Sequence, residues 1–198
     1  MGMEHKAYLF DTNRFDRELK PVINTSVLLS DTKGLEDFIS SHVGEVRSVY
    51  TGELLGIDWK NSLENGGIQE LCDIALTLYY SPDEDMGLSY GWDALNEALS
   101  MTSIKFPSDY YILGESIEYG SFQLDPGGLG LGFVYSKDIA IMYNDLVSIK
   151  SALNHNGLPD PNAVLYQLTK SELLETYNEL VLLYSAAYEK KWGLLMTF

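Results

Sequence analysis

The stretch Thr169–Phe198, TKSELLETYNELVLLYSAAYEKKWGLLMTF, decides the fold of this chain. Its first four residues match a capping box, in which the Thr169 hydroxyl accepts a backbone N–H and the Glu172 side chain reaches back. The pattern predicts a helix to about Lys191, with an apolar stripe formed by Leu173, Tyr177, Leu180, Val181, Tyr184, Ala187 and Tyr188. Leu194–Phe198 is then expected as a terminal strand that docks into a sheet.

Upstream of this stretch, strands and helices are both expected. Apolar runs predict strands over residues 6–10, 108–113, 117–124 and 133–135, and residues 46–59 are expected to contain a hairpin. Helical spacing and cap residues predict helices over residues 12–19, 34–43, 67–80, 90–101 and 137–153, with Pro21 stopping the first and Ser136 capping the last. The sequence therefore predicts a single α+β domain over residues 1–198, with a mixed β-sheet packed by about five or six helices.

Negative charge is concentrated in the middle of the chain. The net charge is −16, and residues 61–136 contain twelve carboxylates but only one cation, Lys105. Carboxylates so close in sequence repel one another, and such a concentration of charge usually either keeps a protein soluble or binds a basic partner. Nucleic acid and acidic membranes are poor partners, because phosphate contacts need a basic stripe.

The remaining sequence signals concern the location of the chain and its chemistry. Cys72 is the one cysteine and is expected to be buried, so no disulfide framework is possible. No signal peptide and no apolar stretch of ~20 residues is evident, which predicts a cytoplasmic protein. His5, His42 and His155 lie in different segments without the spacing of metal ligands, and Gly127–Gly132 lacks both phosphate-binding fingerprints. We expect no catalytic constellation, no metal and no cofactor.

Four segments carry a family resemblance. They are LSYGWDALNEAL at 88–99, ILGESI at 112–117, LGLGFVYS at 129–136 leading into a helix, and 177–188 before the closing strand. Over residues 80–198 the chain resembles the YfbM-like bacterial family of unknown function, which implies a compact α+β domain without established catalytic residues. In size and acidity the chain also resembles immunity proteins, which neutralise toxin enzymes in bacterial competition.

Two functions follow as expectations. The first is an acidic protein-binding module, namely an immunity or inhibitor protein that neutralises a basic toxin such as a nuclease. Its partner-binding face is predicted to comprise Asp83, Glu84, Asp85, Tyr90, Glu115, Glu118, Tyr119 and Asp125. The alternative is a small-molecule-binding protein or hydrolase-type enzyme, with an aromatic and acidic pocket lined by Tyr90, Trp92, Tyr110, Tyr111, Glu115 and Tyr119.

Overall fold

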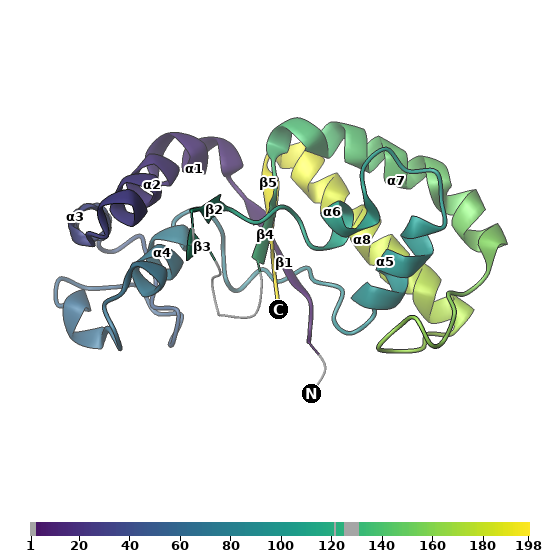
Figure 1. Ribbon diagram of the computed structural model, residues 1–198, viewed down its shortest axis with the longest axis horizontal. Helices are drawn as coiled ribbons and strands as arrows, with labels where there is room; N and C mark the ends of the chain where they lie inside the picture. Colours follow the sequence, from purple (N-terminus) through teal and green to yellow (C-terminus); the bar gives the residue numbers. More distant parts are fainter. Residues whose placement is uncertain (1–2, 121, 125–130) are drawn as a thin grey trace.

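The computed structural model describes residues 3–120, 122–124 and 131–198 (Figure 1). Its helices are α1 Thr12–Glu18, α2 Lys20–Leu29, α3 Lys33–Ser41, the 3₁₀-helix η1 Trp59–Ser62, α4 Ile68–Leu76, α5 Trp92–Ser100, α6 Ser108–Ile112, α7 Ser136–Asn156 and α8 Lys170–Lys190. Its strands are β1 Lys6–Phe10, β2 Glu118–Tyr119, β3 Phe122–Gln123, β4 Leu131–Val134 and β5 Gly193–Thr197. The predicted α+β class is confirmed, including the capping box of α8 and the strand that follows it.

The C-terminal strand lies at the centre of the main sheet. The strand order is β1-β5-β4, and both neighbours run antiparallel to β5. Leu195 of β5 is opposite Tyr8 on one side and opposite Phe133 on the other. The strands β2 and β3 form a separate antiparallel pair. A mixed sheet was expected, but every strand pairing among the described residues is antiparallel.

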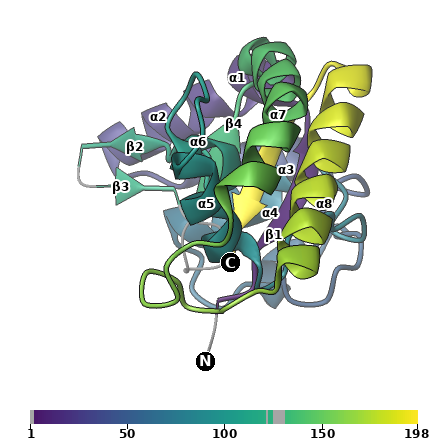
Figure 2. The ribbon, with the colours of Figure 1, turned by 90° about the vertical axis from the view of Figure 1, so that its right-hand side faces the viewer.

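Both faces of the main sheet are buried under helices. Alternate residues of β1 and β5 enter different cores: Ala7 and Leu194 pack with α5–α8, whereas Tyr8 and Leu195 pack with α1–α4. Figure 1 shows these two groups of helices on opposite sides of the sheet, and Figure 2 shows α7 and α8 lying side by side. Because neither face meets water, the strands read as continuous apolar runs rather than as an alternating pattern.

The two outer edges of the sheet are covered by irregular chain. On the β1 edge, the backbone of His5 bonds with Ser89 in both directions, and Met86 N–H donates to Ala7. On the β4 edge, Glu115 exchanges both backbone hydrogen bonds with Phe133. These hydrogen bonds occupy backbone N–H and C=O groups at the outer edges of the sheet, which could otherwise pair with a strand of another chain.

Three expectations about local structure were wrong. Ser108–Leu113 was expected as a strand, but it forms α6, which follows Pro107 and buries Tyr111 and Ile112. Pro21 does not stop a helix; it lies in the first turn of α2, where a missing N–H costs nothing. The described residues therefore contain eight α-helices rather than five or six.

Other expectations held only in outline. Ser136 is the first residue of α7 rather than its cap, and its hydroxyl donates to Asn13. Where one strand was expected over residues 117–124, residues 118–119 and 122–123 form the separate strands β2 and β3, and residues 46–59 contain one isolated bridge, Arg47 to Leu54. Residues 125–128, whose Asp-Pro-Gly-Gly sequence predicts a turn, lie outside the described residues.

One glycine contact explains how α6 reaches the sheet. A Cβ on Gly132 of β4 would lie 1.8 Å from the Leu113 carbonyl oxygen, and Gly114 opposite it has φ +70°. The backbones at Gly132 and Gly114 therefore pass too close to each other for a side chain on Gly132, and only glycine fits there. In the described part of the chain, no helix combines the length and the apolar content that crossing a bilayer requires.

Candidate functional site

The predicted partner-binding residues lie at opposite edges of the sheet. Asp83, Glu84 and Tyr90 flank the segment that covers β1, whereas Glu115 and Glu118 belong to the segment that covers β4. Four strand spacings of ~4.8 Å separate the two covering segments, which places them roughly 19 Å apart. The structure therefore brings these residues together in two groups rather than in one. Tyr119 lies in β2, and Asp125 lies outside the described residues.

Asp85 differs from its two acidic neighbours. Its Oδ1 atom accepts hydrogen bonds from the Ala7 N–H at 3.1 Å and from the Gly87 N–H at 2.9 Å. It therefore attaches the covering segment to β1, although the residue itself is exposed. Asp83 and Glu84 are exposed, and their carboxylates form no hydrogen bond or ion pair with a described residue. Tyr90 is also exposed, and its ring packs against Tyr166 with 5.4 Å between the centroids.

The predicted aromatic pocket would require Trp92 and Tyr111 to line an open surface, but both are buried. Trp92 and Tyr111 are core residues; the Trp92 indole N–H donates to the Met3 carbonyl, and the Tyr111 hydroxyl donates to Asp145. The Tyr110 hydroxyl donates to Asp138. Burial first, and then these carboxylates, raise the pKa of both tyrosines far above the usual value, so both hydroxyls stay protonated.

Glu115 instead lines a polar pocket of about 330 Å³. This pocket, the Lys20 pocket, is lined by Asn13, Asp16, Lys20, Glu115, Tyr135, Ser136 and Lys137. Lys20 Nζ donates to Asp16 at 2.9 Å and to the Tyr135 hydroxyl at 3.0 Å. Partial burial alone lowers the pKa of Lys20, but these hydrogen bonds outweigh it and the pKa is raised. The pocket thus combines two cations with two carboxylates.

A second surface, which the sequence analysis did not identify, lies between α3 and α4. Residues 42–67 form an irregular stretch, the α3–α4 segment, that exposes apolar side chains. Ile57 is 87% exposed, Leu54 53% and Tyr50 50%. Exposed apolar side chains are ordinary when scattered, but a group on one short segment marks an interaction site. The sequence signal was the set of apolar residues around Gly52 and Gly56, which was interpreted as a hairpin.

The α3–α4 segment is fixed to the fold by a buried carboxylate. Glu70, in the first turn of α4, accepts backbone N–H bonds from Glu64, Asn65 and Gly66, and the Tyr50 hydroxyl donates to it at 3.0 Å. Burial alone would raise the pKa of Glu70, but these four donors outweigh burial and lower it. The segment is irregular, yet its backbone is well anchored.

A pocket of about 440 Å³ opens on this segment. We call it the Trp59 pocket; Leu54, Leu55, Ile57 and Trp59 supply its apolar part, and Ser48, Thr51, Glu53, Gly56, Asp58 and Ser62 supply the rest. Trp59 is 4% exposed and fixes the position of the pocket, because it belongs to the core under α1–α4. The carboxylates of Glu53 and Asp58 form no hydrogen bond or ion pair with a described residue.

The cations near this surface are engaged within the protein. The α3–α4 segment contains four carboxylates and two cations, Arg47 and Lys60. Arg47 Nη1 donates to the Gly52 carbonyl at 2.8 Å, and Lys60 forms an ion pair with Glu36. The Trp59 pocket therefore lies in a region whose negative charge is not compensated locally.

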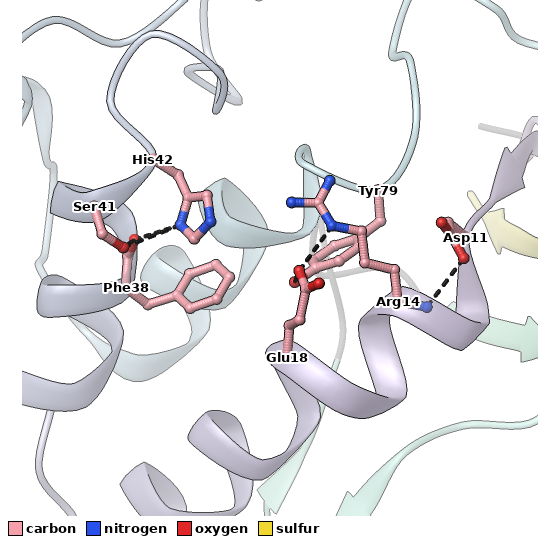
Figure 3. A network of polar contacts seen from close by, with 7 residues as sticks. All are labelled: Asp11, Arg14, Glu18, Phe38, Ser41, His42 and Tyr79. Atoms are coloured by element: carbon pink, nitrogen blue, oxygen red, sulfur yellow. Dashed lines mark hydrogen bonds and ion pairs between the residues drawn. The ribbon is translucent and has the colours of Figure 1, made fainter.

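A further ion pair occupies Arg14 of α1 (Figure 3). Its Nε donates to Glu18 at 2.7 Å, its guanidinium lies 5.5 Å from the centre of the Tyr79 ring, and its backbone N–H donates to Asp11. In the same view, His42 packs on the Phe38 ring, and its Nδ1 lies 2.9 Å from the Phe38 carbonyl. Apart from the contact with Tyr79, these contacts lie within or at the ends of α1 and α3, which they brace.

Among the described residues, no cluster of three or more His, Cys, Asp or Glu side chains could hold a metal ion. Cys72 is buried, and burial raises the pKa of its thiol far above the usual value, so it stays a neutral core residue. His5 is buried as well and serves the fold.

Comparison with known proteins adds no relative. No protein-family model, curated protein or solved structure matches the chain. The resemblance to the YfbM-like family therefore stays a prediction from the sequence, and function must be argued from the surfaces described above.

Proposed function

We propose that this protein is an acidic binding module for a basic protein, and that it contacts this partner through the α3–α4 segment. An immunity or inhibitor protein directed against a basic toxin, such as a nuclease, is the concrete form of this proposal. A nuclease must carry cations to hold phosphates, and an acidic surface suits such a target.

The observation that carries the proposal is the coincidence of two properties on one segment. Leu54 and Ile57 expose apolar surface, while the surrounding carboxylates outnumber the cations and both cations are engaged internally. Protein interfaces combine an apolar centre with a polar rim, and opposed charges accelerate encounter. The residues predicted from the sequence alone, Asp83 with Glu84 and Glu115 with Glu118, add negative potential at a greater distance.

Affinity capture tests the proposal. The full chain is immobilised and exposed to extract of the cells that encode it, at about 50 mM and about 500 mM salt, because screening weakens charge attraction. We expect a basic protein that binds at low salt and is largely released at high salt. With that protein purified, Leu54→Ser combined with Ile57→Ser should weaken binding by about 30-fold, the effect of losing a hot spot.

A matched variant controls for nonspecific loss of apolar surface. Val147 and Leu182 are exposed apolar residues on α7 and α8, on the other side of the sheet. Val147→Ser combined with Leu182→Ser should leave binding unchanged. If both double variants bind equally, or if the captured protein is acidic, the proposal is wrong. Inhibition of the captured protein's enzymatic activity tests the immunity function separately from binding.

The Lys20 pocket favours a second candidate function, the binding of a small molecule. It is polar, about 330 Å³ in volume, and presents Lys20 and Lys137 around the Tyr135 ring opposite Glu115. This charge pattern suits a ligand that has both an anionic and a cationic group. Screening free amino acids for a rise in melting temperature, with Lys137→Gln as the comparison, tests it; equal shifts in both proteins exclude the pocket.

A further inference from the structure

We infer that the Trp59 pocket receives one long cationic side chain, an arginine or a lysine, from the basic partner. This inference rests on the proposed function and specifies the group that is recognised. Such a side chain has an apolar stem and a charged head, and the two parts prefer different surroundings.

The lining of the Trp59 pocket matches these two parts. Leu54, Ile57 and Trp59 offer apolar surface to the stem, and Glu53 and Asp58 offer carboxylates to the head. A purely apolar ligand would leave these carboxylates desolvated without a partner, which is costly. An anionic ligand would meet two like charges. A cationic head with hydrogen-bond donors is the group that both carboxylates stabilise.

The chain's own cations near the pocket are engaged within the protein, and Lys60 Nζ lies 5.6 Å from the centre of the Trp59 ring while it pairs with Glu36. Glu53 and Asp58 have no side-chain partner among the described residues. Arg47, six positions before Glu53, donates to the Gly52 carbonyl, and Lys60, two positions after Asp58, pairs with Glu36. An external cation therefore does not have to displace an internal ion pair.

The pocket is also preformed. Leu55 N–H donates to Val46, Gly44 N–H donates to Leu55, and Trp59 N–H donates to Gly56, so the backbone on both sides of the pocket is fixed. Arg47 N–H further donates to the Thr77 hydroxyl at 2.8 Å, which ties the segment to the end of α4. A preformed pocket loses little conformational entropy when it binds.

The test uses small probes in place of the unidentified partner. N-acetyl-arginine methylamide is titrated into the ¹⁵N-labelled full chain, and the indole N–H signal of Trp59, assigned with Trp59→Phe, is followed by NMR. We expect this signal to shift with a dissociation constant on the order of 1 mM. Trp92 and Trp192 do not line the pocket, so the chemical shifts of their indole N–H signals should not change.

Two comparisons isolate the charge. The citrulline analogue keeps the shape of arginine without its charge, and it should bind about tenfold more weakly. Glu53→Gln combined with Asp58→Asn should weaken arginine binding by a similar factor. Asp37→Asn combined with Glu45→Gln is the control, since it removes two exposed carboxylates that do not line the pocket; this variant should bind like the parent protein.

The outcomes separate this inference from the proposed function. If arginine and citrulline bind equally, or if the Glu53/Asp58 variant binds like its control, the inference is wrong. A basic partner that still depends on Leu54 and Ile57 would then leave the proposed function standing. If the arginine probe binds as expected but affinity capture yields no basic protein, the proposed function fails while the pocket's preference for a cation is retained.

Discussion

His5 Nε2 lies 2.7 Å from the carbonyl oxygen of Ile112 and so joins β1 to the end of α6. A carbonyl oxygen only accepts, so Nε2 carries the proton, while Nδ1 accepts the Leu88 N–H at 3.1 Å. Both hydrogen bonds therefore require the neutral imidazole, because in the protonated ring Nδ1 would carry a proton and could not accept the Leu88 N–H. Burial lowers the pKa of His5 to about 4, although Ile112 and Asp85 act in the opposite direction.

This arrangement predicts an acid-sensitive fold. In the unfolded chain His5 takes up a proton near pH 6.5, whereas the folded chain resists protonation down to about pH 4. The free energy of unfolding should therefore fall as the pH drops from about 6.5 to about 4, by up to about 3 kcal/mol. Urea unfolding between pH 7 and pH 5 measures it. His5→Gln cannot titrate, and its stability should depend less on pH in this range; an identical slope would contradict the assignment.

The three adjacent acids of residues 83–85 should respond differently to mutation. Asp85→Ala removes the acceptor for two backbone N–H groups and should lower the free energy of unfolding by about 2 kcal/mol. Asp83→Ala and Glu84→Ala should each change it by less than about 0.5 kcal/mol, because these exposed side chains accept no hydrogen bond from a described residue. Chemical unfolding of the three variants tests the distinction. Equal losses at all three positions would mean that Asp85 does not hold this segment on β1.

The backbone crossing at Gly132 predicts a severe effect of a single methyl group. Gly132→Ala places Cβ 1.8 Å from the Leu113 oxygen, so α6 or β4 must shift, and the expected loss of stability is about 3 kcal/mol or more. Gly56→Ala is the control, because a Cβ there meets nothing within 4 Å. Thermal unfolding compares them; a Gly132→Ala protein as stable as its control would contradict the crossing.

The anchoring of the α3–α4 segment is testable at single amides. Glu70→Gln weakens the acceptor for the N–H groups of Glu64, Asn65 and Gly66, so these amides should exchange with solvent faster. The expected global loss is about 2 kcal/mol. Hydrogen exchange followed by NMR measures both effects. Tyr50→Phe removes one donor to Glu70 and should cost about 1 kcal/mol while keeping amide protection.

The sequence predicted those elements whose own residues determine them. The capping box and the apolar stripe specify α8, and the apolar runs specify β1, β4 and β5. In α6, Tyr110 and Tyr111 favour a strand by composition, but their hydroxyls reach Asp138 and Asp145 from a helix. Tertiary contacts override intrinsic preference in such short segments.

The candidate site was less predictable, because it depends on strand order. Nothing in the spacing of Asp83 and Glu115 reveals that β5 enters between their neighbouring strands and separates them. Net charge along the sequence also does not show which carboxylates are used internally. Glu70 and Asp85 contribute to the acidic middle of the sequence, yet both accept backbone hydrogen bonds in the fold.

The central position of β5 has a consequence during protein synthesis. Residues 193–197 separate β1 from β4 and complete both helical layers, yet they emerge from the ribosome after every other element described. In a nascent chain without these residues, β1 and β4 lack the strand that pairs with both of them, and the apolar side chains of Tyr8, Leu9 and Phe133 are left exposed. Such a chain is exposed to aggregation until β5 is available to pair with both strands.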